Sequence, residues 1–160
     1  MTATAPRLER THMDFLKLPE RTTKPRESGI THVLDKGYSL DQVRDFLSAA
    51  GEYVDIVKLG WGTALVTPHL KQTIDLYQSH GVPVCFGGTL FEVCLRQNKL
   101  EEYLQTVRDM GIDHIEVSDG TVPMDRKERT ALVRRLTKEF KVLSEVGSKD
   151  VEVVFSPQRW

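Results

Sequence analysis

Residues 54–63, VDIVKLGWGT, are the stretch that decides the fold. They form an apolar run rich in β-branched residues that ends at Gly60 and Gly62. Such a run indicates a strand buried on both faces, and therefore a parallel sheet covered by helices. Lys58 is the exception, because an ammonium inside such a strand is costly unless it pairs or reaches a polar cavity. A site facing a ligand is predicted at Lys58, with an ion-paired or snorkelling lysine as the alternative.

The same pattern recurs along the chain. Four more strands that end in glycine are predicted at residues 29–37, 82–88, 112–120 and 141–147. Helical segments follow the first four strands, at the spacing of right-handed crossover units, so a parallel sheet is close to forced. Two architectures fit this pattern, an open doubly wound sheet and a closed eight-unit TIM barrel. The first strand-to-helix turn, DKGYS, lacks the G-x-G-x-x-G fingerprint, which weakens the dinucleotide-binding version.

Capping residues mark the predicted helix starts. These are Ser39 with Gln42, Thr67 with Pro68, Thr89 with Glu92, and Asp125 with Glu128. The third helix is expected to falter at residues 96–99 and to resume as far as Gly111. The capping box accounts for Glu92 without any functional role.

Composition places the chain among soluble globular domains. Of its 160 residues, 39% are hydrophobic and 28% are charged, and the formal net charge is −1. This predicts no nucleic-acid partner and no membrane partner, since no basic footprint and no membrane-spanning run is present. Cys85 and Cys94 form neither a disulfide framework nor a metal cluster, so both are predicted to be reduced residues of a cytoplasmic protein.

Two parts of the chain are distinguished. Residues 1–28 hold three of the seven prolines and are predicted to form an arm, disordered at its start. Residues 29–160 are predicted to form the amino-terminal part of a (β/α)8 barrel domain if the barrel is the right architecture. At the carboxyl end Ser156 and Pro157 resemble a helix start, yet the sequence stops at Trp160. We therefore expect the front part of a longer protein, with about five of the eight units of a barrel.

Polar side chains gather where the strands end, which is where parallel β/α folds bind ligands. They are Asp35, Lys36, Lys58, Glu116, Ser118, Asp119, Glu145 and Lys149. This mixture of carboxylates and ammoniums suits an anionic substrate held partly through a divalent cation, and oxygen ligands favour Mg²⁺. The alternatives are structural, because Asp35 could accept loop amides, Lys36 could be solvated and Asp119 could be a turn residue. Gly87 and Gly88 could present amides to a phosphate at the start of a helix.

Five motifs carry a resemblance to a known family. They are LDKG at 34–37, KLGWGT at 58–63, GGTLFE at 87–92, EVSDG at 116–120 and SEVGSK at 144–149. In order and spacing they resemble phosphosulfolactate synthase, and GGTLFE together with GWGT is highly specific. The KPR motif at 24–26 resembles the branch outside methanogens, which includes plant heat-stress-associated relatives.

The resemblance implies a TIM barrel and a Mg²⁺-dependent lyase of coenzyme M biosynthesis, which adds sulfite to phosphoenolpyruvate to give (2R)-phospho-3-sulfolactate. It places the general acid on Lys149, with Lys58 as electrostatic stabiliser or alternate acid. The carboxylates on the metal side would be Asp35, Glu116, Asp119 and Glu145, without a decision on which of them ligate. Substrate binding would fall to Lys36, Gly87, Gly88 and Ser118.

Several alternatives stay open at this point. A relative with another phosphorylated enol or keto acid substrate, such as a Schiff-base aldolase using Lys58, is one. A non-enzymatic, stress-associated protein on the same barrel is another. We also expect the 160-residue product to be impaired, or to associate into a homo-oligomer that covers its sheet edges.

Overall fold

The computed structural model describes residues 15–17, 19 and 22–147, and within them strands and helices alternate. The strands are β1 (His32–Asp35), β2 (Ile56–Leu59), β3 (Val84–Phe86), β4 (His114–Val117) and β5 (Lys141–Ser144). The helices are α1 (Leu40–Ala50), α2 (Leu70–Ser79), α3 (Gly88–Arg96), α4 (Leu100–Asp109) and α5 (Arg126–Leu136), with 3-10 turns η1 (Gly51–Tyr53) and η2 (Thr63–Leu65). None of these described helices is long and apolar enough to cross a membrane.

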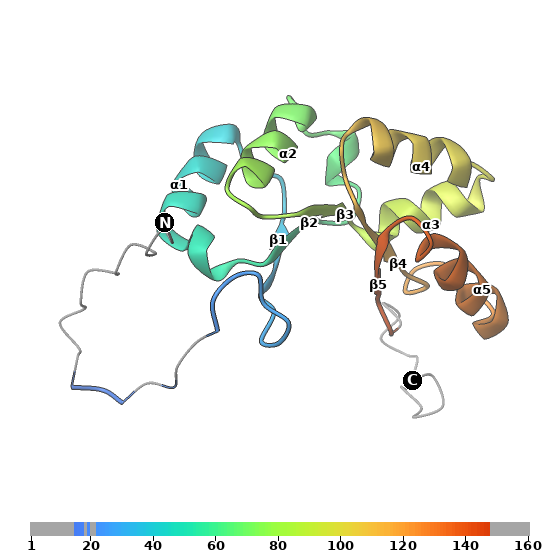
Figure 1. Cartoon of the computed structure of the whole chain (residues 1–160). Coiled ribbons are helices and arrows are strands. Elements are labelled where there is room, and N and C mark those ends of the chain that lie inside the picture. Colours follow the sequence, from blue (N-terminus) through green and yellow to red (C-terminus); the bar gives the residue numbers. More distant parts are fainter. Residues whose placement is uncertain (1–14, 18, 20–21, 148–160) are drawn as a thin grey trace.

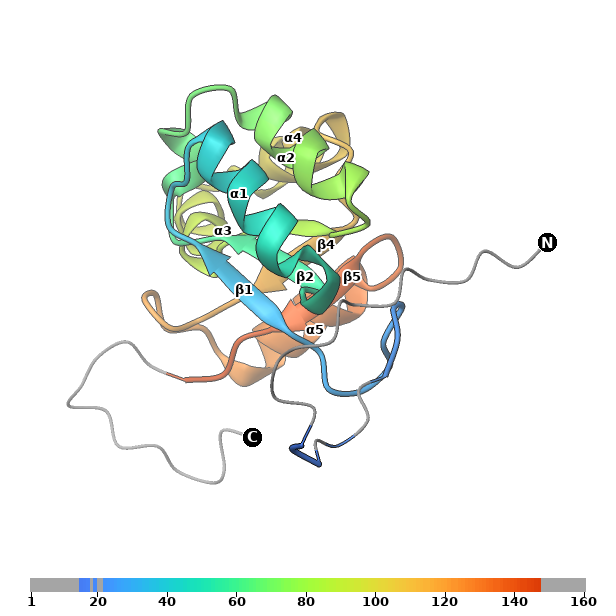
Figure 2. The same cartoon turned by 90° about the vertical axis from the view of Figure 1, so that its left-hand side faces the viewer.

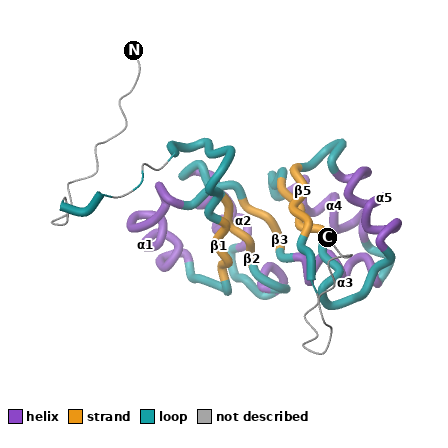
Figure 3. Tube along the Cα trace, turned by 90° about the horizontal axis from the view of Figure 1, so that it is seen from below, coloured by secondary structure: helices purple, strands orange, loops and turns teal. Residues whose placement is uncertain are grey.

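All strand pairs are parallel. The first sheet has the order β1-β2-β3, and β4 pairs with β5 in a second sheet. β3 contacts β4, and the five strands follow one another along a curved row with α1 at one end and α5 at the other (Figure 3). The predicted parallel β/α array is confirmed, and the arrangement is consistent with part of a TIM barrel.

The strand register separates two faces. Lys58 stands beside Leu34 of β1 and Cys85 of β3, so these three side chains share one face of the sheet. Val57 and Val84 belong to the opposite face and are at most 1% exposed. Helices α1, α2 and α4 lie on one side of β1, β2 and β3 (Figures 1 and 2), where they cover the apolar face. The face that carries Lys58 is therefore the inner, concave one.

Helices α1 and α5 begin as the sequence predicts. Ser39 caps α1 by accepting the amide of Gln42 at 3.3 Å, and the Gln42 side chain accepts the Ser39 amide at 2.9 Å, which completes a capping box. Asp125 caps α5 by accepting the amide of Lys127 at 2.8 Å. Local capping chemistry is thus sufficient to place these two starts.

Helix α2 begins later than predicted. Its first residue is Leu70, and the preceding His69 has a φ of 57°, a left-handed conformation that interrupts any helix running from Thr67. The Thr67 hydroxyl donates instead to the carbonyl of Thr63 at 2.7 Å. The prediction that Thr67 and Pro68 open this helix was wrong, because Thr67 completes the preceding 3-10 turn.

Helix α3 also departs from its prediction. It begins at Gly88, one residue before the predicted Thr89, and no side chain caps it. Glu92, which was assigned to a capping box with Thr89, accepts hydrogen bonds from the segment after β4 instead. The capping-box prediction for Glu92 was therefore wrong.

The described end of the predicted arm is attached to the amino-terminal edge of the sheet. Lys24 donates to the carbonyl of Gly51 at 2.7 Å, and Arg26 pairs with Asp55 at 2.8 Å. The second oxygen of Asp55 accepts the amide of Thr31 at 2.8 Å. The helix start predicted at 156–157 lies outside the described residues.

Candidate active site at the carboxyl ends of the strands

An ion pair joins β2 to β4 on the inner face. The ammonium of Lys58 lies 2.6 Å from Oε1 of Glu116, and the two side chains are 20% and 4% exposed. Both residues occupy the third position of a four-residue strand, near the carboxyl end. Parallel strands and alternating side chains bring them to one mouth, as the sequence predicts.

The environment of Lys58 keeps its ammonium charged. Burial alone would lower the pKa of Lys58, but the hydrogen bond and the charge of Glu116 outweigh it, so the pKa is raised above 10.5. Glu145, which follows β5 and is half-buried, is close enough for its charge to act in the same direction. The structure therefore brings three predicted site residues together: Lys58, Glu116 and Glu145.

Two further groups on this face were not recognised from the sequence as neighbours of Lys58. Burial raises the pKa of the Cys85 thiol to about 12, and the charge of Glu116 adds to the effect, so this thiol is neutral. His32 lies 4.0 Å from it through Nε2, and burial and the Lys58 charge lower the pKa of this imidazole. The pairing of β2 with β1 and β3 would have identified both, since side chains in adjacent register share a face.

The start of α3 is bound by Glu116. The amide of Gly88 donates to Oε2 of Glu116 at 2.7 Å, and the amide of Gly87 donates to the carbonyl of Leu59 at 2.8 Å. A Cβ at Gly88 would lie 2.4 Å from Cβ of Ser118, so only glycine permits this approach of α3 to β4. The amides that were predicted to bind phosphate are thus occupied by acceptors of the protein itself, with the Glu116 carboxylate as the anion at the helix start.

Glu92 and Ser118 form a buried hydrogen-bonded group beside this site. The Ser118 hydroxyl donates to Oε1 of Glu92 at 2.5 Å, and Oε2 accepts the amides of Thr121 and Val122 at 2.7 and 2.5 Å. Glu92 and Ser118 are at most 1% exposed. Ser118, predicted to bind substrate, therefore holds the loop between β4 and α5 to helix α3.

Asp35 does not face the site. It is 1% exposed, its Oδ1 accepts the amides of Gly37 and Tyr38 at 2.7 and 2.8 Å, and its Oδ2 accepts the Tyr77 hydroxyl at 2.9 Å. Asp35 stands in register with Leu59, one residue beyond Lys58, so it points to the helix side of the sheet. The expectation that Asp35 converges with Lys58 was wrong.

Asp119 and Lys36 have other neighbours. Asp119 is 5% exposed and pairs at 3.1 Å with Arg129 of α5, an arginine outside the sequence motifs quoted above. Lys36 is exposed in the loop after β1, with its ammonium 5.7 Å from the ring centre of Trp61, which is 48% exposed. Lys149, the predicted general acid, lies outside the described residues.

The described residues do not fit a dedicated metal site. No group of three or more histidine, cysteine, aspartate or glutamate side chains able to hold a metal occurs among them. Asp35 and Glu116 use both carboxylate oxygens in hydrogen bonds, and Asp119 faces an arginine. Glu145, the fourth predicted metal-side carboxylate, acts on Lys58 through its charge.

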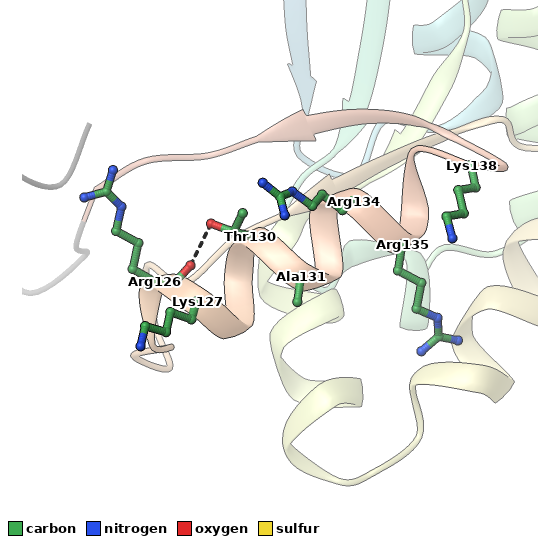
Figure 4. A pocket seen from close by; sticks show the side chains of 7 residues that line it. All are labelled: Arg126, Lys127, Thr130, Ala131, Arg134, Arg135 and Lys138. Carbon is green, nitrogen blue, oxygen red and sulfur yellow. Dashed lines mark hydrogen bonds between the residues drawn. The ribbon is translucent and has the colours of Figure 1, made fainter.

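A separate, open cavity of about 530 Å³ lies along α5 (Figure 4). Its lining is strongly cationic and consists of Arg126, Lys127, Thr130, Ala131, Arg134, Arg135 and Lys138. The Thr130 hydroxyl donates to the carbonyl of Arg126 at 2.8 Å within it. None of the predicted site residues lines this cavity, so it is distinct from the mouth that contains Lys58.

The sequence matches a known protein family and several of its curated members. Residues 19–160 match the model of the family described as (2R)-phospho-3-sulfolactate synthase (ComA). A phosphosulfolactate synthase of Bacillus subtilis is 44% identical over 150 residues, which cover 92% of this chain and 60% of the relative. A phosphosulfolactate synthase of Methanothermobacter thermautotrophicus is 44% identical over 142 residues, covering 87% of this chain and 55% of the relative.

The third relative is a phosphosulfolactate synthase of Methanocaldococcus jannaschii. It is 39% identical over 126 residues, which cover 77% of this chain and 50% of the relative. The chain thus spans between half and 60% of the length of the three curated relatives. The matched region contains Lys58, Glu116 and the other residues of the site described above.

Proposed function

The chain belongs to the (2R)-phospho-3-sulfolactate synthase (ComA) family, and from this we propose that it takes part in adding sulfite to phosphoenolpyruvate. The product would be (2R)-phospho-3-sulfolactate, and the reaction is that of a carbon-sulfur lyase in coenzyme M biosynthesis. The observation that carries the proposal, beside family membership, is the pairing of Lys58 with Glu116 at the carboxyl ends of parallel strands.

The chemistry needs a fixed positive charge. The sulfur lone pair of sulfite attacks the methylene carbon of phosphoenolpyruvate and forms the C–S bond, while the double-bond electrons move onto the adjacent carbon and its carboxylate. A proton then adds to that carbon. Lys58 would stabilise the extra negative charge through its ammonium, which is the kind of preorganised electrostatic contribution that lowers such barriers most. Lys36, exposed at the same end of the strands, would attract the anionic substrates.

The raised pKa of Lys58 favours a role as electrostatic stabiliser over a role as general acid. Burial alone would lower this pKa, but Glu116 raises it, so Lys58 is a poor proton donor at neutral pH. Electrostatic stabilisation is therefore its proposed role, and Lys149 remains the proposed general acid. A Schiff-base aldolase needs a lysine with a depressed pKa, so this second enzyme function is disfavoured. Borohydride trapping of a keto acid on Lys58 would contradict that conclusion.

The proposal includes Mg²⁺ because the predicted reaction requires it, and not because a metal site is identified. Bound Mg²⁺ would neutralise charge on the phosphorylated substrate, and it is commonly held by one or two carboxylates plus substrate oxygens. We assign no ligand, because the described carboxylates do not form a metal group. Turnover in the presence and absence of Mg²⁺, with EDTA as a control, tests this part separately.

The proposal also covers the cellular compartment and the oligomeric state of the chain. Both cysteines are free, which fits a reducing, cytoplasmic compartment. Within the described residues β1 lies at an edge of its sheet, and such edges favour association with another chain. A homo-oligomer is therefore proposed, and sedimentation velocity would measure it.

The decisive experiment measures phosphosulfolactate formed from phosphoenolpyruvate and sulfite. Lys58→Met should lower the rate at least about 100-fold, since it removes the charge that stabilises the intermediate. Lys71→Met is the matched control, because Lys71 is an exposed lysine that pairs with Asp75 on α2, and it should retain the parent rate. Equal rates in the parent chain and Lys58→Met would refute the proposal for this chain.

A further inference from the structure

We propose that Glu116 is a positioning residue, which fixes the Lys58 ammonium by joining it to the first turn of α3. The inference rests on the proposed function only in assuming that Lys58 stabilises negative charge on the substrate. It replaces the role of metal ligand that the sequence predicts for Glu116, and it assigns no direct contact with substrate to this carboxylate.

The two oxygens of Glu116 have different partners from different elements. Oε1 accepts the Lys58 ammonium of β2 at 2.6 Å, and Oε2 accepts the Gly88 amide of α3 at 2.7 Å. A carboxylate that is 4% exposed and held at both oxygens has little freedom to rotate. The position of Lys58 is therefore set by the packing of α3 against β4, and it does not depend on the flexible lysine chain alone.

The approach of α3 to β4 is itself closely determined. A Cβ on Gly88 would lie 2.4 Å from Ser118 and 3.4 Å from the carboxyl carbon of Glu116. Ser118 in turn donates to Glu92, which lies one turn further along α3. The close approach at Gly88 thus brings its amide within hydrogen-bonding distance of Glu116.

Glu116 raises the pKa of Lys58 more than any other neighbour does. Among the described residues, Cys85 of β3 and Glu145 after β5 also act on Lys58, and the Lys58 charge in turn lowers the pKa of His32 on β1. Burial raises the pKa of the Cys85 thiol to about 12, which leaves it neutral, and Glu145 acts through its charge without a hydrogen bond to Lys58. Without the Glu116 carboxylate, the largest influence opposing burial would be gone, so the pKa of Lys58 should fall.

An ammonium has three N–H donors. Within the part of the chain that the structure describes, Lys58 gives one of them to Glu116. Two donors therefore remain for an anionic ligand at the mouth, and the lysine presents them from a fixed position. This arrangement would spare the substrate the entropic cost of ordering a long side chain.

The experiment measures the pH at which Lys58 becomes reactive. The chain is labelled with brief pulses of acetic anhydride between about pH 8 and 11.5, and the modified lysines are quantified by peptide mapping. The midpoint of the labelling curve reports the pKa, whereas the plateau reports accessibility. Lys71, exposed on α2, serves as the internal reference.

Three variants separate positioning from general stability. Glu116→Gln should lower the labelling midpoint of Lys58 by about one unit or more, which is about a tenfold rise in labelling at pH 9. Glu116→Asp keeps the charge and should restore most of the shift. Glu92→Gln alters the buried carboxylate of α3 but keeps a side-chain oxygen there, so it should leave the midpoint unchanged. An unchanged midpoint in Glu116→Gln, or an equal shift in Glu92→Gln, would overturn the inference.

Labelling in the presence of phosphoenolpyruvate tests the proposed function separately from the positioning role of Glu116. If the proposed function holds, phosphoenolpyruvate should protect Lys58 of the parent chain from labelling, while Lys71 is unaffected. A midpoint shift in Glu116→Gln without such protection would support the positioning role and count against the substrate. Protection without a midpoint shift would support the substrate and refute the positioning role.

Discussion

Replacing Glu92 by alanine provides the sharpest test of how this site is held together. Glu92 accepts the Ser118 hydroxyl at one oxygen and the amides of Thr121 and Val122 at the other. It therefore ties α3 to the chain that follows β4, over separations of 26 to 30 residues. The capping box read from the sequence would instead confine its effect to the first turn of one helix.

The two interpretations predict different losses of stability. Three donors would lose their acceptor in Glu92→Ala, at about 1 to 1.5 kcal/mol each, so the free energy of unfolding should fall by about 3 to 4.5 kcal/mol. Glu92→Gln keeps an oxygen for the two amides and should cost less, about 1 to 2 kcal/mol, because the hydrogen bonds lose their charge. A capping box would give about 1 kcal/mol for alanine and almost nothing for glutamine, which serves equally well at that position.

Urea unfolding followed by circular dichroism measures these differences, with the slope of the transition checked for constancy. Glu102→Ala is the matched control, since Glu102 is an exposed glutamate on α4 that pairs with exposed Lys99, and it should leave stability close to that of the parent chain. A loss in Glu92→Ala of about 1 kcal/mol or less would refute the long-range role, because the three donors would then have found other acceptors.

Two further predictions concern other buried carboxylates. Tyr77→Phe removes the hydroxyl that donates to Asp35 at 2.9 Å, and urea unfolding should show a loss of about 1 to 3 kcal/mol; a loss below about 0.5 kcal/mol would mean that Asp35 does not need this donor. Burial alone would raise the pKa of Asp55, but the Thr31 amide and Arg26 hold it below its ordinary value, so its stabilising effect is present above about pH 4 and is lost as the pH falls through the lowered pKa. Acid unfolding should therefore show that Asp55→Asn is less stable than the parent chain near pH 6 and that the difference shrinks below about pH 4; equal differences at both ends would contradict this.

The sequence predicts those parts of the fold that depend on local patterns. Apolar runs ending in glycine place all five strands, and the capping residues Ser39 and Asp125 place two helix starts. Helix α2 is misplaced because Thr67 can complete a 3-10 turn as well as cap a helix. The left-handed conformation of His69, which decides between the two, has no signal in the sequence. Local chemistry is thus informative only where a single local partner is available.

Local sequence patterns also do not identify the partners of Glu116, because these partners lie far away in the sequence. A carboxylate in an apolar strand must be partnered, and this reasoning correctly separates Glu116 from a solvated glutamate. It does not identify the partner, which in this structure includes the Gly88 amide of a helix that begins 28 residues earlier. Glycine at 88 has two possible explanations in the sequence, an amide presented to a phosphate or a close approach, and the proximity of Ser118 supports the second.

The strongest constraint on the site comes from strand register, which the sequence alone leaves undetermined by one residue. Lys58 and Asp35 end neighbouring strands and were expected to meet, yet Lys58 pairs in register with Leu34 and Asp35 pairs with Leu59. A shift of one residue reverses the face of every side chain, so it decides whether Asp35 lies at the mouth or beneath Tyr77. The buried Asp35 carboxylate also accepts the Tyr77 hydroxyl of α2, a donor that it would lose in the other register. This hydrogen bond therefore helps to hold Lys58 on the inner face, although Asp35 itself takes no part in the site.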